Sequence, residues 1–569
     1  MSWTFKRKYT DLLTHESGYE KKIWGDYLTV CLVYPNTYRT GMSSLGFQTI
    51  YAIINNHRSF LCERAFLPDP GDEAVFASGS IPLFSLESQK PLAEFDIVAF
   101  SISYENDYPN ILKIMEMARI TFDSLHRKGR EPLVVGGGIA VTLNPEPLAD
   151  FFDLFLIGEG EEILPEFLQT FEESRGCDFA KDEFLLRVQK EIEGAYVPKL
   201  YTFRYGSNQR IERIEPLHAS IPEKIKKRWI MDINSFNTHQ CITTPNAEFG
   251  DLYLTEISRG CTRGCRFCAA GFACRPARFR NADTLNPVFL EAMTAQKTIG
   301  LLGTAVSDHP ELFSMTDFIL QEHGKVSLGS LRLDRLDKEM ANLLNKTGIE
   351  TVSLAPEAGS QRLRNVINKG ITEQHILSAV ESLTSYGIVN VRLYFMVGLP
   401  TETEDDIDAI ILLVKRIKHQ AVKRTGGKRP FRRITLSINQ FIPKPVTPFQ
   451  WHPLEETRVV KKRISRIKRA LLGDSSIKII HDLPKWNYIQ ALFSLGDRHT
   501  GKILLTVHRN TGNWSKAFKE ININPDFYVY RPKRTDEILP WEIIDHGVSK
   551  EYLIAEYGKA LSSSYSSEA

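Results

Sequence analysis

Three cysteines stand close together near the middle of the chain. Cys261, Cys265 and Cys268 follow the spacing Cys-x3-Cys-x2-Cys, so one loop can present three thiolates to one small inorganic cluster. Most iron–sulfur clusters take four cysteine ligands. A 4Fe-4S cluster held by three leaves one iron with an open coordination position, as in catalytic rather than closed structural metal sites. The loop therefore predicts a cluster that can bind a further ligand.

Other uses of these cysteines fit less well. No histidine lies between Cys241 and Cys274, and the Cys-x5-Cys offset from Cys268 to Cys274 matches no zinc pattern. An odd number of neighbouring thiols does not indicate a disulfide framework. The eight cysteines of the 569-residue chain are sparse, which fits a reducing compartment. Without an apolar signal or a run long enough to span a bilayer, we expect a cytoplasmic protein with no membrane partner.

The cysteine spacing resembles the signature of the radical S-adenosylmethionine (SAM) enzymes. The resemblance implies that the open iron chelates the amino and carboxylate groups of SAM. It further implies reductive cleavage of SAM to a 5′-deoxyadenosyl radical, which abstracts hydrogen from the substrate. An electron donor such as flavodoxin or ferredoxin would be a partner.

Strand-like and helical patterns alternate between residues 251 and 451. Strands are expected at residues 252–257, 299–306, 325–333, 351–355, 389–397 and 434–441. Helices are expected at residues 287–296, 310–321, 336–347, 373–386 and 404–418. Such alternation favours a parallel sheet. Six units match the partial (β/α)6 TIM-like barrel of the resembled enzymes, whose chemistry lies at the carboxyl ends of the strands.

Motifs at successive strand ends match the family's SAM contacts. The resemblance assigns SAM binding to Phe267, Gly303, Glu357, Ser360, Arg392, Val397, Gly398 and Leu399. A carboxylate at Glu357 can accept from both ribose hydroxyls. Glycine at position 398 permits close backbone approach to the adenine. Gly303 follows the second strand, although the family's usual Gly-Gly-Glu is absent there.

These residues also have structural interpretations. Glu357 alone fits a solvated turn, and Phe267 fits a core position. Arg332 and Arg392 point at the same rim by strand position and could meet the SAM carboxylate, or form structural salt bridges.

The upstream region predicts a doubly wound sheet. Buried strands are expected at residues 27–34, 95–103, 132–136 and 153–157, with helices at residues 44–55 and 109–127. Ligands of such sheets bind at the carboxyl-edge switch point. The layout resembles the cobalamin-binding-like domain of many radical SAM proteins, but the turn after the first strand lacks the histidine ligand of cobalamin. Two interpretations stay open: cobalamin bound without histidine, or a domain that packs on the barrel or gates it.

The domain organisation expected is a cobalamin-binding-like domain at 1–175, a linker region with strands at 176–248, the barrel at 249–455, a basic helix with a small α+β region at 456–560, and a disordered tail at 561–569. Basic residues crowd the stretch from 423 to 469, namely Lys423, Arg424, Lys428, Arg429, Arg432, Arg433, Arg458, Lys461, Lys462, Arg463, Arg466, Lys468 and Arg469. Such a patch can guide RNA or be a solvated face.

The prediction is therefore an α/β radical SAM enzyme that modifies an unidentified substrate, by methylation or by methylthiolation-type chemistry. Methylthiotransferases of tRNA carry additional amino-terminal cluster cysteines, which Cys31 and Cys62 alone cannot supply. The alternative is a non-catalytic iron–sulfur redox or iron sensor with an RNA-binding surface.

Overall fold

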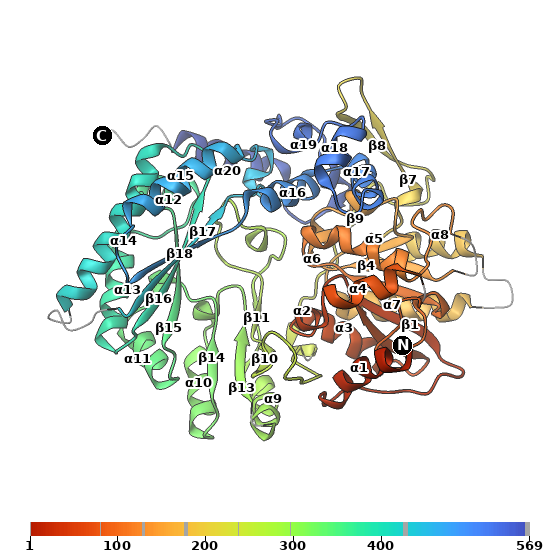
Figure 1. Cartoon of the computed structure of the whole chain (residues 1–569), viewed down its shortest axis with the longest axis horizontal. Coiled ribbons are helices and arrows are strands. Elements are labelled where there is room, and N and C mark those ends of the chain that lie inside the picture. Colours follow the sequence, from red (N-terminus) through yellow and green to blue (C-terminus); the bar gives the residue numbers. More distant parts are fainter. Residues whose placement is uncertain are drawn as a thin grey trace. The chain divides into compact units, whose positions relative to one another are not determined.

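The computed structural model describes residues 2–79, 81–127, 131–175, 180–236, 238–295, 297–424 and 431–563. They form two units, each built around its own sheets (Figure 1). The first unit comprises Met1–Asp251, Leu492–Tyr528 and Asp536–Gly547, and the second comprises Leu252–Ala491, Val529–Thr535 and Val548–Ala569. The carboxyl-terminal segment thus contributes to both.

A largely parallel sheet forms the centre of the first unit, in the order β2-β1-β3-β4-β5-β6 with β6 antiparallel to β5. The strands are β1 Leu28–Tyr34, β2 Phe60–Phe66, β3 Ile97–Ser101, β4 Leu133–Gly137, β5 Leu154–Leu156 and β6 Ala195–Tyr196. Because β1 pairs with β2 on one side and with β3 on the other, the strand order reverses at β1. A ligand site is expected at the carboxyl edge beside this switch point.

Helices and small ladders complete the first unit. The helices are α1 Ser2–Thr14, α2 Tyr38–Gly41, α3 Leu45–Asn56, α4 Pro70–Ala77, α5 Tyr108–Met117, α6 Ile139–Leu143, α7 Gly160–Ser174, α8 Lys181–Glu191, α17 Arg498–Arg509 and α18 Trp514–Glu520. The ladders pair β7 Tyr201–Tyr205 with β8 Ile211–Pro216 and β9 Ile225–Lys226 with β19 Ile544–Asp545. Helix α17 packs on α5, so a late segment of the chain closes the amino-terminal unit.

A buried ion pair fixes this closure. Arg498 Nε donates to Oε2 of Glu146 at 2.6 Å, and Arg498 Nη2 donates to the hydroxyl of Tyr196 at 2.9 Å. The Glu146 side chain has no exposed surface. Because a buried carboxylate needs a partner, Arg498 is a structural requirement of the first unit.

Seven parallel strands form the second unit, in the sheets β10-β13-β14 and β15-β16-β17-β18. They are β10 Leu252–Glu256, β13 Thr298–Leu302, β14 Val326–Leu328, β15 Thr351–Glu357, β16 Asn390–Val397, β17 Arg433–Gln440 and β18 Ile477–His481. The helices are α9 Ala282–Thr294, α10 Leu312–Gln321, α11 Lys338–Lys346, α12 Gln361–Val366, α13 Glu373–Ser385, α14 Glu404–Arg424, α15 Thr457–Ala470 and α20 Lys550–Ser562. Helices α16 Pro484–Leu495 and α19 Asp526–Val529 span the unit boundaries.

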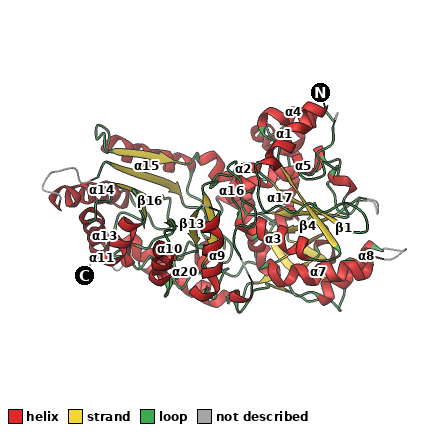
Figure 2. Cartoon of the chain, turned by 90° about the horizontal axis from the view of Figure 1, so that it is seen from below, coloured by secondary structure: helices red, strands yellow, loops and turns green. Residues whose placement is uncertain are grey.

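Side chains alternate between two faces of the second unit's strands. On β16, Val391, Leu393, Phe395 and Val397 belong to the main apolar core, together with residues of α9, α10, α11, α13, α14 and α15. Figure 2 shows α13 and α14 beside β16. The intervening Arg392, Tyr394 and Met396 lie outside this core. One face of the strands is therefore covered by helices and the other carries polar side chains.

The predicted α/β class, with a doubly wound sheet before a partial barrel, is confirmed. Several elements differ from expectation: β2 and β18 are additional strands, and β14 is short. Helix α5 ends at Met117 because Arg119 has φ +59°, which a right-handed helix cannot continue. Helix α20 reaches Ser562, and residues 564–569 of the predicted tail lie outside the described residues. Of the helices described, none has the length and hydrophobicity of a membrane span.

Candidate iron–sulfur and SAM site

The cysteine loop is held at both ends. β11 (Ser258–Arg259) before the loop pairs antiparallel with β12 (Arg278–Phe279) after it. Gly260 enters the loop with φ +79°, and a Cβ there would lie 2.2 Å from the carbonyl oxygen of Cys274. Only glycine lets these two stretches of backbone approach so closely. Cys261, Cys265 and Cys268 are all free thiols, the second buried and the other two half-buried.

Burial keeps two of these thiols neutral in the metal-free chain. It raises the pKa of Cys265 to about 11. Burial also raises the pKa of Cys268, against the opposing effect of the N–H groups of Gly271 and Ala270. Cluster assembly must therefore displace protons from the loop. Among the residues that the structure describes, no three His, Cys, Asp or Glu side chains are gathered to hold a single metal ion.

Lys369 stands at the centre of a charged group beside the loop. Its Nζ donates to Oε1 of Glu357 at 2.9 Å and lies 5.9 Å from the centroid of the Phe267 ring. Its charge opposes the burial that raises the pKa of Cys265. Glu357 sits at a bulge ending β15 with φ +64°, an uncommon conformation for this residue type that is often found at functional sites.

A second charged group joins the loop to the ends of β13 and β14. Arg263 Nε donates to Oδ2 of Asp308 at 3.1 Å, and its backbone N–H donates to Sγ of Cys261 at 3.4 Å. Arg332 Nε donates to Oδ1 of Asp334 at 3.0 Å, whereas its Nη2 is buried without a hydrogen-bond partner. An unpaired buried donor costs about 1–3 kcal/mol. A ligand carboxylate at Arg332 would remove this cost.

Family comparisons identify the arrangement. The model of the radical SAM superfamily matches residues 255–414, which hold the cysteine loop and Glu357. The chain contains a domain of the radical SAM superfamily. A second model, for the amino-terminal part of radical SAM proteins, matches residues 46–198. The family resemblance of the cysteine motif is thereby confirmed, and with it an enzyme whose superfamily uses a 4Fe-4S cluster and SAM.

Individual relatives of this radical SAM protein are distant. An uncharacterised protein of Methanocaldococcus jannaschii is 29% identical over 84% of this chain and 90% of the relative. An uncharacterised methyltransferase of Pyrococcus horikoshii is 26% identical over 50% of this chain and 58% of the relative. The radical SAM methyltransferase TsrM from Kitasatospora setae, solved with cobalamin and a 4Fe-4S cluster, covers 87% of this chain and 100% of its own at a TM-score of 0.50. At 12% identity this likeness shows the fold alone.

The predicted SAM residues of the radical SAM domain lie in different surroundings. Leu399 and Phe267 contact one apolar cluster, while Val397 is buried in the main core. Ser360 Oγ accepts from the N–H of Leu363 at 3.1 Å and so caps α12. The Gly398 N–H donates to Oε2 of Glu402 at 2.7 Å. The Ser360 hydroxyl and the Gly398 amide therefore already have protein partners.

Two further predicted residues are positioned by backbone register. A Cβ at Gly303 would lie 2.3 Å from Oγ of Ser258, so the glycine makes room for the strand before the cysteine loop. Arg392 is exposed, and it precedes by three residues Phe395, the register partner of Glu357. Since a strand rises about 3.3 Å per residue, Arg392 lies roughly 10 Å from Glu357 along the strands, toward their amino-terminal ends.

Carboxyl groups outside the basic helix α15 accept hydrogen bonds from two of its arginines. Arg463 Nη1 donates to Oε2 of Glu402 at 2.8 Å, and Arg466 Nε donates to Oδ1 of Asp408 at 2.7 Å. Two cations of the predicted patch thus join α15 to α14 and to the turn before it. Lys428 and Arg429, also part of that patch, lie outside the described residues.

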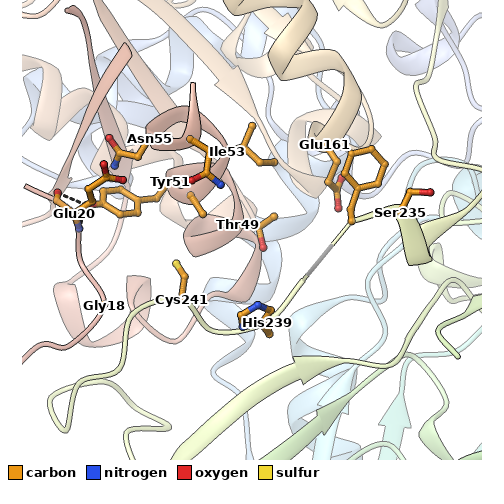
Figure 3. A pocket seen from close by; sticks show the side chains of 13 residues that line it. Gly18, Glu20, Thr49, Tyr51, Ile53, Asn55, Glu161, Ser235, His239 and Cys241 are labelled. Carbon is orange, nitrogen blue, oxygen red and sulfur yellow. Dashed lines mark hydrogen bonds between the residues drawn. The ribbon is translucent and has the colours of Figure 1, made fainter. Parts of the chain in front are cut away.

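The first unit contains a separate cavity of about 480 Å³ (Figure 3). It lies between α3, the start of α7 and the segment around residues 235–241, and its polar lining includes Glu20, Thr49, Asn55, Glu161, His239 and Cys241. Burial raises the pKa of Cys241 to about 11, so this thiol is neutral at physiological pH. None of the described residues lining the cavity belongs to the cysteine loop.

Proposed function

We propose that this radical SAM enzyme holds a 4Fe-4S cluster on Cys261, Cys265 and Cys268 and uses SAM to methylate an unidentified substrate. When bound, the reduced cluster supplies the electron that cleaves the sulfonium of SAM. The observation that carries the proposal is the convergence of Lys369, Glu357 and Phe267 beside the three-cysteine loop.

The surrounding side chains suit the parts of SAM. The unpaired Nη2 of Arg332 suits the carboxylate. Glu357, oriented by Lys369, would accept from the ribose hydroxyls. Phe267 and Leu399, which share an apolar cluster, would enclose the adenine. These contacts fix the cofactor and exclude water, which is the protein's part in cofactor chemistry.

Burial of Cys31 and Cys62 favours methylation over methylthiolation. Cys31 on β1 and Cys62 on β2 have 0% and 1% of their surface exposed, and burial raises the pKa of both thiols. Thiols locked in the centre of a sheet cannot ligate a second cluster. Several similar proteins are tRNA-2-methylthio-N(6)-dimethylallyladenosine synthases, but they match about 30% of this chain.

Cobalamin is the methyl carrier that the first unit suits best. In the turn after β1, Asn36 Nδ2 donates to Oδ1 of Asp107 at 2.9 Å, and residues 34–41 include no histidine. Tyr104 and Ile139, which follow β3 and β4 at the carboxyl edge, are 42% and 40% exposed. Exposed apolar surface beside a switch point fits a broad, flat ring system held without a side-chain ligand.

The test is anaerobic reconstitution of the full chain with iron, sulfide, dithionite and SAM, followed by mass spectrometry of 5′-deoxyadenosine and S-adenosylhomocysteine. We expect one or both products from the parent chain and from Cys274→Ala, and neither from Cys265→Ala. Hydroxocobalamin should bind stoichiometrically and shift the products toward S-adenosylhomocysteine. An intact cluster that turns over no SAM would instead support the sensor alternative.

A further inference from the structure

The four-stranded sheet β15–β18 has one face that lies outside the main helix-covered core. Its register aligns Ser353 with Arg392, Arg392 with Thr435, and Thr435 with Lys478. Side chains in register on neighbouring strands share a face of the sheet. The adjacent row, which contains Val352, Val391 and Ile434, belongs to the helix-covered core. The row from Ser353 to Lys478 therefore lies on the opposite face, here called the open face.

Three cations surround Thr435 on the open face. Arg392 and Lys478 flank it on β16 and β18, and Arg433 precedes it by two residues on β17; all three are exposed. With strands about 4.8 Å apart, Arg392 and Lys478 are roughly 10 Å from each other. Exposed cations at this separation repel one another only weakly, whereas an anion between them would be attracted by all three. We call these three residues the cationic triad.

The open face offers the triad little neutralising charge. Among the described residues of β15 to β18, the only carboxylate is that of Glu357, beyond the bulge at the end of β15. Glu357 lies at the carboxyl end of β15 and is already bound by Lys369. The three strands that carry the triad thus contribute no acid of their own.

We infer that the cationic triad binds a phosphate group of the substrate. The guanidinium group of an arginine can donate hydrogen bonds to two phosphate oxygens at once. The hydroxyls of Ser353 and Thr435 can donate to the remaining oxygens. The triad's row lies roughly 10 Å below the level of Glu357. A phosphate anchored there would leave the far end of a nucleoside or sugar phosphate close to the strand ends, where the SAM contacts are proposed. The inference rests on the proposed function for the reaction, but not for phosphate binding itself.

The experiment titrates metal-free full-length protein with pyrophosphate, AMP and a short single-stranded RNA by calorimetry. We expect Arg392→Gln and Lys478→Gln each to weaken pyrophosphate and AMP binding about tenfold, roughly the loss of one charge-assisted contact. Lys462→Gln, which removes an exposed charge from α15, is the matched control and should leave the affinity unchanged.

Each outcome bears on one claim. Equal affinity for pyrophosphate in parent and triad variants would overturn the inference. RNA binding that is tighter than AMP binding and lost in the triad variants would overturn the assignment to a small molecule. Because no cluster is needed for these titrations, phosphate binding together with failed SAM cleavage would refute the proposed function alone.

Discussion

Lys369→Met tests the organisation of the SAM site most directly. The Nζ–Oε1 distance to Glu357 is 2.9 Å, and the two side chains are 12% and 14% exposed. At an effective dielectric constant of about 20, the Coulomb attraction is about 6 kcal/mol. Desolvation of both groups offsets most of it, and hydrogen bonds to charged groups contribute about 1.5–3 kcal/mol net.

Methionine keeps much of the length of lysine but leaves Glu357 without its cation. We therefore expect a loss of about 2 kcal/mol, which lowers the melting temperature of the metal-free protein by about 4–8 °C. SAM affinity of the reconstituted enzyme should fall about tenfold, because Glu357 would no longer be oriented toward the ribose.

Calorimetric melting and equilibrium dialysis with labelled SAM measure the two effects. Lys346→Met at the exposed end of α11 is the control, for which we expect a change within about 0.5 kcal/mol. If both the melting temperature and the SAM affinity of Lys369→Met equal those of the control, the pair does not organise the site.

Three further predictions follow from single contacts. Gly260→Ala should reduce iron incorporation far more than Gly348→Ala. Both positions have positive φ, but only a Cβ at position 260 would meet the backbone of Cys274. Iron analysis after reconstitution measures the effect, and equal losses in the two variants would contradict the prediction. Arg498→Met should destabilise the first unit by about 3–5 kcal/mol in urea unfolding because Glu146 is left buried without its counter-charge, whereas a loss below 1 kcal/mol would mean that the pair is dispensable. Burial raises the pKa of Glu402 to about 8, so the folded state retains a proton that the unfolded state releases, and stability should fall by up to about 1.4 kcal/mol per pH unit between pH 5 and 8. Glu402→Gln should flatten that slope, and an unchanged slope would assign it to another group.

The elements that were predicted best from the sequence are those with a clear local pattern of apolar and polar residues. Runs such as residues 389–397 alternate apolar and polar side chains, which is why the prediction there nearly coincides with β16. Strand β2 was missed because Glu63 and Arg64 interrupt its apolar pattern. The structure explains their burial, since Arg64 donates to Glu16 and Glu87, while Glu63 accepts from Trp24 and Ser88.

In the candidate site, too, local features could be predicted from the sequence, whereas contacts between distant residues could not. The cysteine spacing is a local signal, and so is the placement of Glu357 at a strand end. Lys369 follows α12 outside any motif that the sequence analysis singled out, and its role depends on a contact with the ring of Phe267 more than a hundred positions earlier. Likewise, the ion pairs of Arg463 with Glu455 and of Arg466 with Asp408 remove positive charge from a patch that the sequence suggested for RNA.

The interleaving of late residues with the first unit has a consequence for biosynthesis. A ribosome releases Glu146 long before it makes Arg498, so the amino-terminal sheet emerges with a carboxylate whose counter-charge does not yet exist. Until Arg498 is made, burial of the ionised Glu146 side chain is unfavourable. The side chain is then more stable either protonated or still exposed to water. The amino-terminal half thus reaches its final packing only after translation is nearly complete, and a fragment cut at the unit boundary would lack part of its own interior.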